Sequence, residues 1–221
     1  MFSVAIDGPA GAGKSTIARS AATQLGFIYV DTGALYRAVG LHCIRSGISA
    51  EDTQAVADCL EKITVELAFK GTEQRVFLCG EDISDDIRSE AVSMMASNVS
   101  KLPVVRQLLL GLQRDIASKN NVIMDGRDIG TVVLPNADVK IFLTASPESR
   151  AKRRTLQLEQ KGETADYDII LEDIKKRDYN DSHREIAPLK PAEGGIIVDT
   201  TELTLEQSIK KITEIISGRI E

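Results

Sequence analysis

The stretch from Gly8 to Ser15 constrains the fold of this chain more than any other. It reads Gly-Pro-Ala-Gly-Ala-Gly-Lys-Ser and fits the pattern G-x-x-x-x-G-K-[ST] in full. The apolar run Phe2 to Ile6 before it predicts a buried strand, and an apolar repeat at helical spacing predicts a helix over residues 14–25, with Gly26 as its stop. A strand, a glycine-rich loop and a helix in this order predict a phosphate-binding loop, because backbone N–H groups and the helix N-terminus bind phosphate oxygens.

The residue types in this loop suggest separate roles. Lys14 is expected to reach the outer phosphates of a nucleoside triphosphate, and Ser15 is expected to hold Mg²⁺. Asp125 ends a second apolar strand at residues 122–124, which favours a position beside the magnesium ion; the alternative is an aspartate that caps a loop. The full set of candidate ATP-binding residues is Gly8, Pro9, Ala10, Gly11, Ala12, Gly13, Lys14, Ser15 and Thr16.

Alternating strands and helices predict an α/β fold around a central parallel sheet. The expected strands are residues 2–6, 27–30, 122–124, 139–143 and 196–198. The expected helices are residues 14–25, 31–44 with Gly47 as the stop, a helix that Ser49 caps before the apolar positions Ala55, Val56, Cys59, Leu60 and Ile63, then 90–99, 103–118 and a last helix that begins at a capping box of Thr204 and Gln207.

Two segments depart from this alternation. Residues 64–87 show period-two patterning around a Lys70-Gly71 turn, which predicts an inserted antiparallel hairpin. Charged helical arms begin at Ser146 and Tyr167, and residues 161–164 interrupt them. Two helices joined by a glycine-bearing turn predict a mobile lid.

Composition and net charge restrict the kinds of molecule that this chain is expected to bind. The 221 residues carry a net charge of -6, which argues against broad electrostatic binding to nucleic acid. No long apolar run predicts a membrane span or a secretory signal, and the three cysteines are scattered, so we expect a cytoplasmic protein. Basic residues cluster near residues 150–154 and 175–184, a pattern that suits a small polyanionic ligand.

The positions of the arginines help to distinguish a kinase from a GTPase or a motor, all of which can have this phosphate-binding loop. The chain has no Asn-Lys-x-Asp motif for guanine, and arginines recur in loops away from the phosphate-binding loop. A kinase must hold a second phosphate against the repulsion of the first, and forked guanidinium groups suit this task. These observations favour a kinase for a small acceptor over a GTPase or a motor. A regulatory module that binds nucleotide without turnover remains the alternative from another class.

Several motifs together resemble the bacterial cytidylate kinases, from Phe2 to the final helix. They are Asp7-Gly8-Pro9 with the phosphate-binding loop, Asp31-Thr32-Gly33-Ala34-Leu35-Tyr36-Arg37, Gly80-Glu81-Asp82-Ile83-Ser84 with Ile87-Arg88, Asp125-Gly126-Arg127-Asp128-Ile129-Gly130-Thr131, and Ala187-Pro188-Leu189. The resemblance implies transfer of a phosphate from ATP, with Mg²⁺, to CMP or dCMP. Another small-acceptor kinase, of UMP/AMP or shikimate type, is the alternative.

The resemblance also implies an organisation for the chain. It implies a three-layer P-loop fold in one domain, with a core at about 1–30, 103–150 and 185–221, a monophosphate-binding region with the β insert at about 31–102, and a lid at about 151–184. Neither nucleic acid nor membrane is an expected partner, and a monomer is expected.

Roles for individual residues follow from the same resemblance. The catalytic set is Lys14, Arg127, Asp128, Arg153 and Arg154. The acceptor-binding set is Thr32, Tyr36, Arg37, Ser97, Arg106, Arg127, Asp128, Arg177, Asp181 and Arg184. Many family members have serine where this chain has Thr32, which keeps the hydroxyl. Cytosine presents a donor amine and acceptors at N3 and O2, so Asp128 can accept while Arg106 and Ser97 donate.

Overall fold

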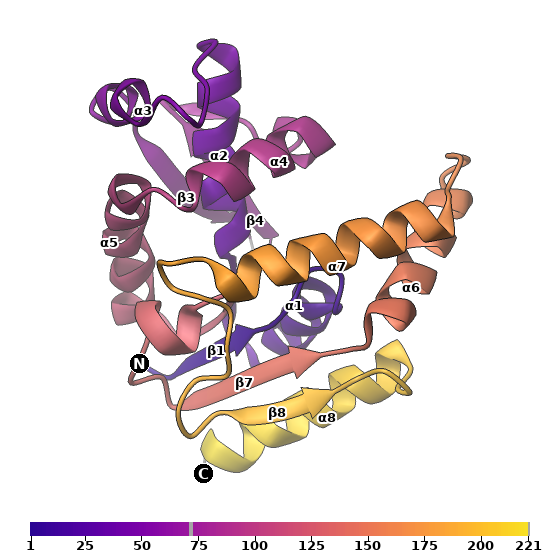
Figure 1. The fold of residues 1–221 in the computed structure, drawn as a ribbon. Helices are drawn as coiled ribbons and strands as arrows, with labels where there is room; N and C mark the ends of the chain where they lie inside the picture. Colours follow the sequence, from indigo (N-terminus) through magenta and orange to yellow (C-terminus); the bar gives the residue numbers. More distant parts are fainter. Residues whose placement is uncertain (71–72, 221) are drawn as a thin grey trace. The chain divides into compact units, whose positions relative to one another are not determined.

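The computed structural model describes residues 1–70 and 73–220, which form two compact units (Figure 1). The first unit contains Met1 and residues 27–122, and the second contains residues 2–26 and those from 123 onward. The turn expected at Lys70-Gly71 includes Gly71, which lies outside the described residues.

A central five-stranded sheet confirms the predicted α/β class. Its strand order is β2-β6-β1-β7-β8, and the register pairs β1 with β7 and β7 with β8 in parallel. The strands are β1 (Ser3–Asp7), β2 (Ile28–Asp31), β6 (Val122–Gly126), β7 (Val139–Thr144) and β8 (Ile196–Asp199). Every strand lies within two residues of its expected position.

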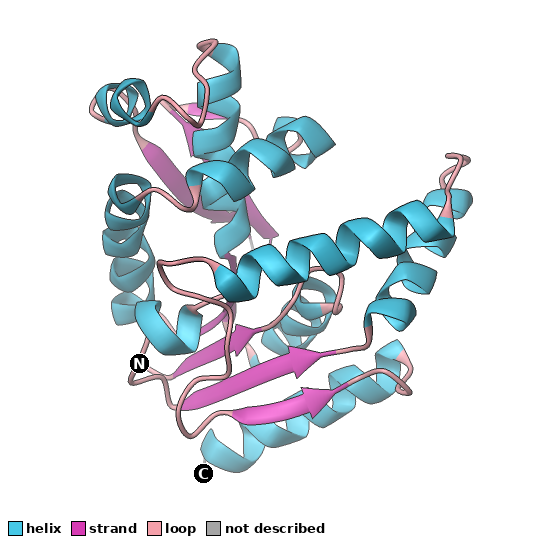
Figure 2. Cartoon of the chain, viewed as in Figure 1, coloured by secondary structure: helices cyan, strands magenta, loops and turns pink. Residues whose placement is uncertain are grey.

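The second unit also contains helices (Figure 2). They are α1 (Lys14–Leu25), the π-helical turn η2 (Ile129–Val133), α6 (Pro147–Gln160), α7 (Tyr167–His183) and α8 (Leu205–Ile220). Helix α1 has the predicted bounds: it buries Ile17 and Ala21 one turn apart, and Gly26 ends it with a φ of 69°. Helices α6 and α7 lie side by side and are joined by the short loop that the sequence predicts (Figure 1).

The first unit has its own hydrophobic core. Its elements are α2 (Thr32–Arg45), α3 (Thr53–Leu60), β3 (Val65–Lys70), β4 (Glu73–Leu78), β5 (Glu81–Asp82), the 3₁₀ turn η1 (Asp86–Arg88), α4 (Glu90–Val99) and α5 (Pro103–Lys119). Antiparallel pairing in the order β3-β4-β5 confirms the inserted hairpin and adds a third short strand. Leu35 and Val39 of α2 pack in one buried cluster with Val76 and Leu78 of β4, which anchors the insert to α2.

Helix caps agree with the sequence except at α3. Ser146 accepts a hydrogen bond from the Ser149 N–H, and Thr204 and Gln207 form the expected capping box. The cap predicted at Ser49 is wrong, because the Asp52 carboxylate accepts from the Ala55 N–H and begins α3 at Thr53. Ser49 instead accepts from the Glu51 N–H in the turn before it.

The described helices include none that is both long and apolar enough to cross a membrane. The expected division into core, monophosphate-binding region and lid follows different boundaries from the two compact units, and it stays a prediction.

Candidate active site

The phosphate-binding loop follows β1 and leads into α1. Gly8 has a φ of 151°, and a Cβ atom at this position would lie 1.9 Å from the Leu143 carbonyl oxygen. Only glycine fits so close an approach between the loop and β7. Gly13, with a φ of 86°, directly precedes the first turn of α1. The N–H groups of that turn have no acceptor within the helix, and they lie next to the loop. Strand, glycine-rich loop and helix thus follow one another as the motif predicts.

Lys14 lies within this loop, where its side chain is buried. Its Nζ donates to the Pro9 carbonyl oxygen at 2.8 Å. Burial, with a smaller contribution from Arg127, lowers the pKa of Lys14 from 10.5 to about 7, against the opposing effect of Asp125 and Asp7. A bound polyphosphate would supply negative charge at this point and favour the charged amine.

Ser15 and Asp125 come together as the sequence predicts. The Ser15 Oγ donates to the Asp125 Oδ2 at 2.9 Å, although 110 residues separate them. Asp125 is 4% exposed at the end of β6. A hydroxyl and a carboxylate at this distance are hard oxygen ligands of the kind that Mg²⁺ prefers, so the residues present fit that ion.

Asp7 holds the segment that follows β6. Its two carboxylate oxygens each accept one N–H, from Ile129 and from Gly130, both at 2.7 Å. These N–H groups begin η2 and directly follow Arg127 and Asp128. One buried carboxylate thus fixes the backbone on which two candidate site residues lie.

Burial raises the pKa of Asp7 from 3.8 to about 6, and nearby Asp128 adds to the shift, whereas the two N–H groups and Lys14 oppose it. Asp7 therefore favours the folded state below pH 3.8, and this contribution is lost as the pH rises through about 6. We expect the free energy of unfolding of the wild type, relative to Asp7→Asn, to fall by about 3 kcal/mol over this range. Urea unfolding of both proteins at a series of pH values measures the difference. A difference that does not vary with pH would contradict the prediction.

Ion pairs organise the candidate acceptor-phosphate residues of the second unit. The Arg127 Nε donates to the Asp181 Oδ2 at 2.8 Å, and both side chains are largely buried. The Arg184 Nη2 lies 3.7 Å from the Asp128 Oδ1, and the Arg184 Nε donates to the Ala187 carbonyl oxygen. Two arginines are thus held among carboxylates at the end of α7, where an anionic ligand could replace those partners.

Arg150 is a buried arginine that the sequence interpretation did not single out as a site residue. It is 2% exposed, and its Nε donates to the Ala145 carbonyl oxygen at 2.9 Å. Its Nη1 donates to the Ala10 carbonyl oxygen at 3.0 Å, and both terminal nitrogens donate to the Asp178 carboxylate. One guanidinium group therefore joins the phosphate-binding loop, α6 and α7. Nothing in the motif pattern indicated this role, since the partners are 28 and 140 residues away.

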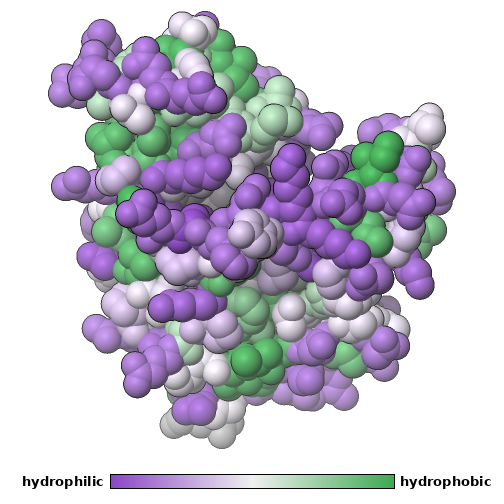
Figure 3. All heavy atoms as spheres, in the orientation of Figure 1, coloured by the Kyte–Doolittle hydropathy of each residue, from purple (hydrophilic) through white to green (hydrophobic). Residues whose placement is uncertain are grey.

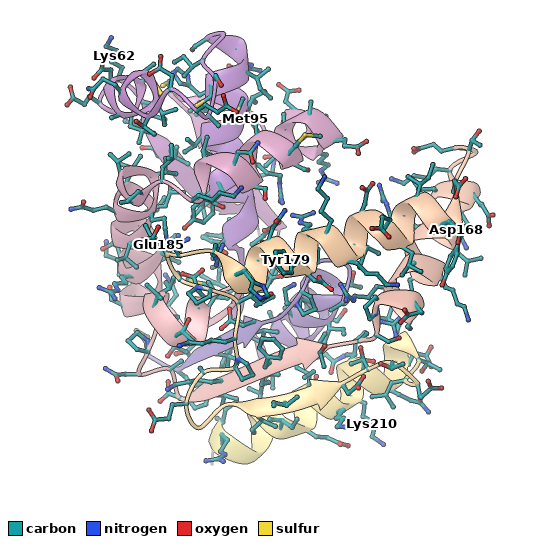
Figure 4. The ribbon with its side chains drawn as sticks, in the orientation of Figure 1. Lys62, Met95, Asp168, Tyr179, Glu185 and Lys210 are labelled. Atoms are coloured by element: carbon teal, nitrogen blue, oxygen red, sulfur yellow. The ribbon has the colours of Figure 1, made fainter. Side chains whose placement is uncertain are left out.

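The remaining lid candidates lie on α6 and α7. The Arg153 Nη2 donates to the Thr200 carbonyl oxygen at 2.5 Å, and the exposed Arg154 pairs with Gln157. Arg177 is exposed on α7, whose outer face in Figure 3 is covered mainly by hydrophilic side chains. Tyr179 is 63% exposed on α7 and stacks on His183 (Figure 4). The roles of these three arginines stay predictions.

A second group of candidates lies in the first unit. Asp31 caps α2 through its Oδ1, which accepts from the Ala34 N–H, and its Oδ2 accepts from the Arg37 Nη2 at 2.7 Å. The Arg106 guanidinium carbon lies 5.9 Å from the centre of the Tyr36 ring. Two further candidates belong to this unit: Thr32 is buried in the first turn of α2, and Ser97 is half-buried on α4. The structure thus brings Tyr36 and Arg106 together and adds Asp31 as the partner of Arg37.

Comparisons with known proteins agree with this arrangement. The family model described as cytidylate kinase matches residues 4–218. The chain is 52% identical to the cytidylate kinase of Caldicellulosiruptor bescii over 214 residues, which cover 97% of this chain and 95% of the relative. It is 50% identical to that of Lactobacillus johnsonii over 219 residues, covering 99% and 95%.

A solved structure of an uncharacterized protein from Eubacterium ventriosum matches the fold with a TM-score of 0.57 at 13% identity, covering 99% of this chain and 100% of that one. The sequence relatives extend over nearly the whole chain, including the phosphate-binding loop, α6 and α7. The chain belongs to the cytidylate kinase family.

Proposed function

We propose that this protein transfers the terminal phosphate of ATP to CMP or dCMP, giving ADP and CDP or dCDP for pyrimidine nucleotide metabolism. The observation that carries the proposal is the phosphate-binding loop, with Lys14 inside it and the Ser15–Asp125 pair beside it, in a chain of this family. ATP-dependent phosphoryl transfer is what family membership implies. The acceptor, the ion and the residue roles are the finer part of the proposal.

ATP binding is assigned to residues 8–16. The backbone N–H groups of the loop and the first turn of α1 would bind the phosphate oxygens, and Lys14 would neutralise charge on the outer phosphates. Ser15 and Asp125 would hold Mg²⁺, which supplies charge neutralisation between the phosphates when it is bound.

Acceptor binding is assigned to arginines. Arg37, Arg127 and Arg184 would hold the phosphate of the acceptor, and each already contacts a carboxylate that an anionic phosphate could replace. Arg177 and Asp181 would meet the ribose, while Thr32 and Tyr36 complete the site. No general base is needed, because the attacking group is an ionised phosphate oxygen. Arg153 and Arg154 would approach the transferred phosphate on lid closure, which also excludes water.

Cytosine is assigned to Asp128, Arg106 and Ser97. Asp128 accepts from the exocyclic amine, and Arg106 and Ser97 donate to N3 and O2. Uracil reverses the donor and acceptor at the first two positions, so it would leave polar groups unpaired in a desolvated site. We also propose that the protein is a cytoplasmic monomer.

The test is ADP release from ATP and Mg²⁺ with CMP, dCMP, UMP, AMP and shikimate offered in turn as acceptors. We expect CMP and dCMP to give the highest kcat/KM, with UMP at least about 100-fold lower because of the polar mismatch. Equal efficiency with CMP and UMP would refute the assignment of the base-binding residues. Preference for AMP or shikimate would favour the alternative kinase, and absence of turnover with every acceptor would favour a regulatory module.

A further inference from the structure

The side chain of Gln74, on β4 of the inserted sheet, binds the backbone of a site residue at two points. Its Oε1 accepts from the Asp31 N–H at 2.8 Å, and its Nε2 donates to the Asp31 carbonyl oxygen at 3.3 Å. Both polar ends of the amide are therefore used on a single residue that lies 43 positions earlier in the chain. Such paired hydrogen bonds restrict translation and rotation of the bound backbone more than one bond does.

Asp31 in turn positions an arginine. It ends β2 and caps α2, and its carboxylate divides between the Ala34 N–H at 3.1 Å and the Arg37 Nη2 at 2.7 Å. The Asp31 and Arg37 side chains are 23% and 27% exposed, so this ion pair is partly shielded from water. The place of the Arg37 guanidinium group therefore depends on the place of the Asp31 backbone.

The support for Gln74 comes from the core of its own unit. Gln74, Val76 and Leu78 share one face of β4, because side chains alternate along a strand. Val76 and Leu78 are 2% and 4% exposed and pack in one buried cluster with α2 residues. The Val76 N–H is itself bound by the Ser84 Oγ at 2.9 Å. Val76 and Leu78 therefore hold β4 in the core, while Gln74 on the same face contacts Asp31 at the beginning of α2.

From this geometry we infer that Gln74 is a positioning residue for the acceptor phosphate, acting through Asp31 on Arg37. The inference rests on the proposed function, in which Arg37 binds that phosphate. It assigns a task to the inserted sheet: a side chain on β4 sets the conformation of the phosphate-binding end of α2. Loss of the amide would let the Asp31 carboxylate and Arg37 sample other conformations, which weakens acceptor binding and leaves the ATP site unchanged.

Gln74→Leu and Gln74→Glu test the inference at the level of kinetics. Leucine removes both hydrogen bonds at similar volume, whereas glutamate keeps the acceptor and places a carboxylate against the Asp31 carbonyl oxygen. We expect both to raise KM for CMP roughly 5- to 20-fold, with KM for ATP within about twofold of wild type. Gln54→Leu is the matched control, because Gln54 pairs only with exposed Asp58 on α3 among the contacts described here, and its KM for CMP should not change.

An Arg37→Ala background separates positioning from general destabilisation. If Gln74 acts through Arg37, adding Gln74→Leu to Arg37→Ala should not raise KM for CMP further. An equal increase in both backgrounds, or an unchanged KM in both single variants of Gln74, would overturn the inference. Gln74→Glu keeps the test informative if the leucine variant folds poorly.

Amide hydrogen exchange without any ligand makes the test independent of the substrate. A peptide covering residues 31–38 should exchange faster in Gln74→Leu than in wild type, while a peptide in α5 should not. Unchanged exchange at residues 31–38 would overturn the inference. Failure of the proposed function would show separately, as absence of CMP turnover in the wild-type protein.

Discussion

Replacing Lys14 with alanine is expected to lower kcat for transfer from ATP to CMP by at least about 100-fold in a protein that stays folded. Lys14 provides a buried amine within the phosphate-binding loop, and its Nζ is held by the Pro9 carbonyl oxygen. In the proposed mechanism this preorganised charge acts on the transferred phosphate in a site that excludes water, which is why we expect its loss to be costly. Burial already lowers its pKa to about 7, so removing it should not reduce the free energy of unfolding much.

The measurements are ADP release at saturating substrates and circular dichroism during heating. Lys210→Ala serves as the matched control, because Lys210 extends from α8 with 78% of its side chain exposed (Figure 4). The control should keep wild-type turnover. Turnover in Lys14→Ala within about threefold of wild type would remove Lys14 from the catalytic set.

Arg127→Ala is expected to lower kcat/KM for CMP by roughly 100- to 1,000-fold. Arg127 lies directly after β6, next to the proposed magnesium ligand Asp125, and its Nε donates to Asp181. Alanine removes the forked donor that we propose for the acceptor phosphate, and it also leaves the 12%-exposed Asp181 carboxylate without this partner. Because the change affects the acceptor, we expect KM for ATP to change far less than KM for CMP.

Two further variants test whether the expected loss of activity in Arg127→Ala comes from the lost charge or from the lost forked geometry of this arginine. Arg127→Lys keeps the charge and loses the forked geometry, so it should recover only part of the activity. Arg45→Ala removes an exposed arginine paired with Glu81 and Asp86, and it should leave kcat/KM for CMP unchanged. Full activity in Arg127→Lys would mean that charge alone suffices, and a parallel loss for ATP and CMP in Arg127→Ala would point to a collapsed site.

Local patterns predicted most of the fold. The spacing of Ile17 and Ala21 with a glycine stop gave the bounds of α1, and alternation in residues 65–69 indicated the hairpin strand β3. The cap of α3 was misassigned because Ser49 and Asp52 are both good capping residues three positions apart, and only the observed backbone distinguishes them. Strand β5 has two residues and the turn η2 has five, too few to show a periodicity.

In the candidate site, too, local patterns predicted some residues, whereas contacts between distant parts of the sequence decide the roles of others. The residues of the phosphate-binding loop form one continuous motif, so they could be predicted together. Asp125 could be predicted because it ends an apolar run that is typical of a buried strand. The roles of Asp7, Gln74 and Arg150 depend on backbone groups far away in sequence, at Ile129, Asp31 and Ala10 respectively. No spacing rule connects such pairs, because tertiary packing alone decides which carbonyl or N–H group a side chain reaches.

Arg150 also constrains any separation of α6 from α7. Its guanidinium group is bound at once to the Ala10 carbonyl oxygen and to the Asp178 carboxylate. Separating the two helices at this point would strand a buried charge, which is far more costly than bending them beyond it. The contacts of Arg150 therefore hold α6 and α7 together at this point, and residues 154–175 lie beyond them. Because the same guanidinium group donates to the Ala10 carbonyl oxygen, the phosphate-binding loop and both helices share one buried anchor.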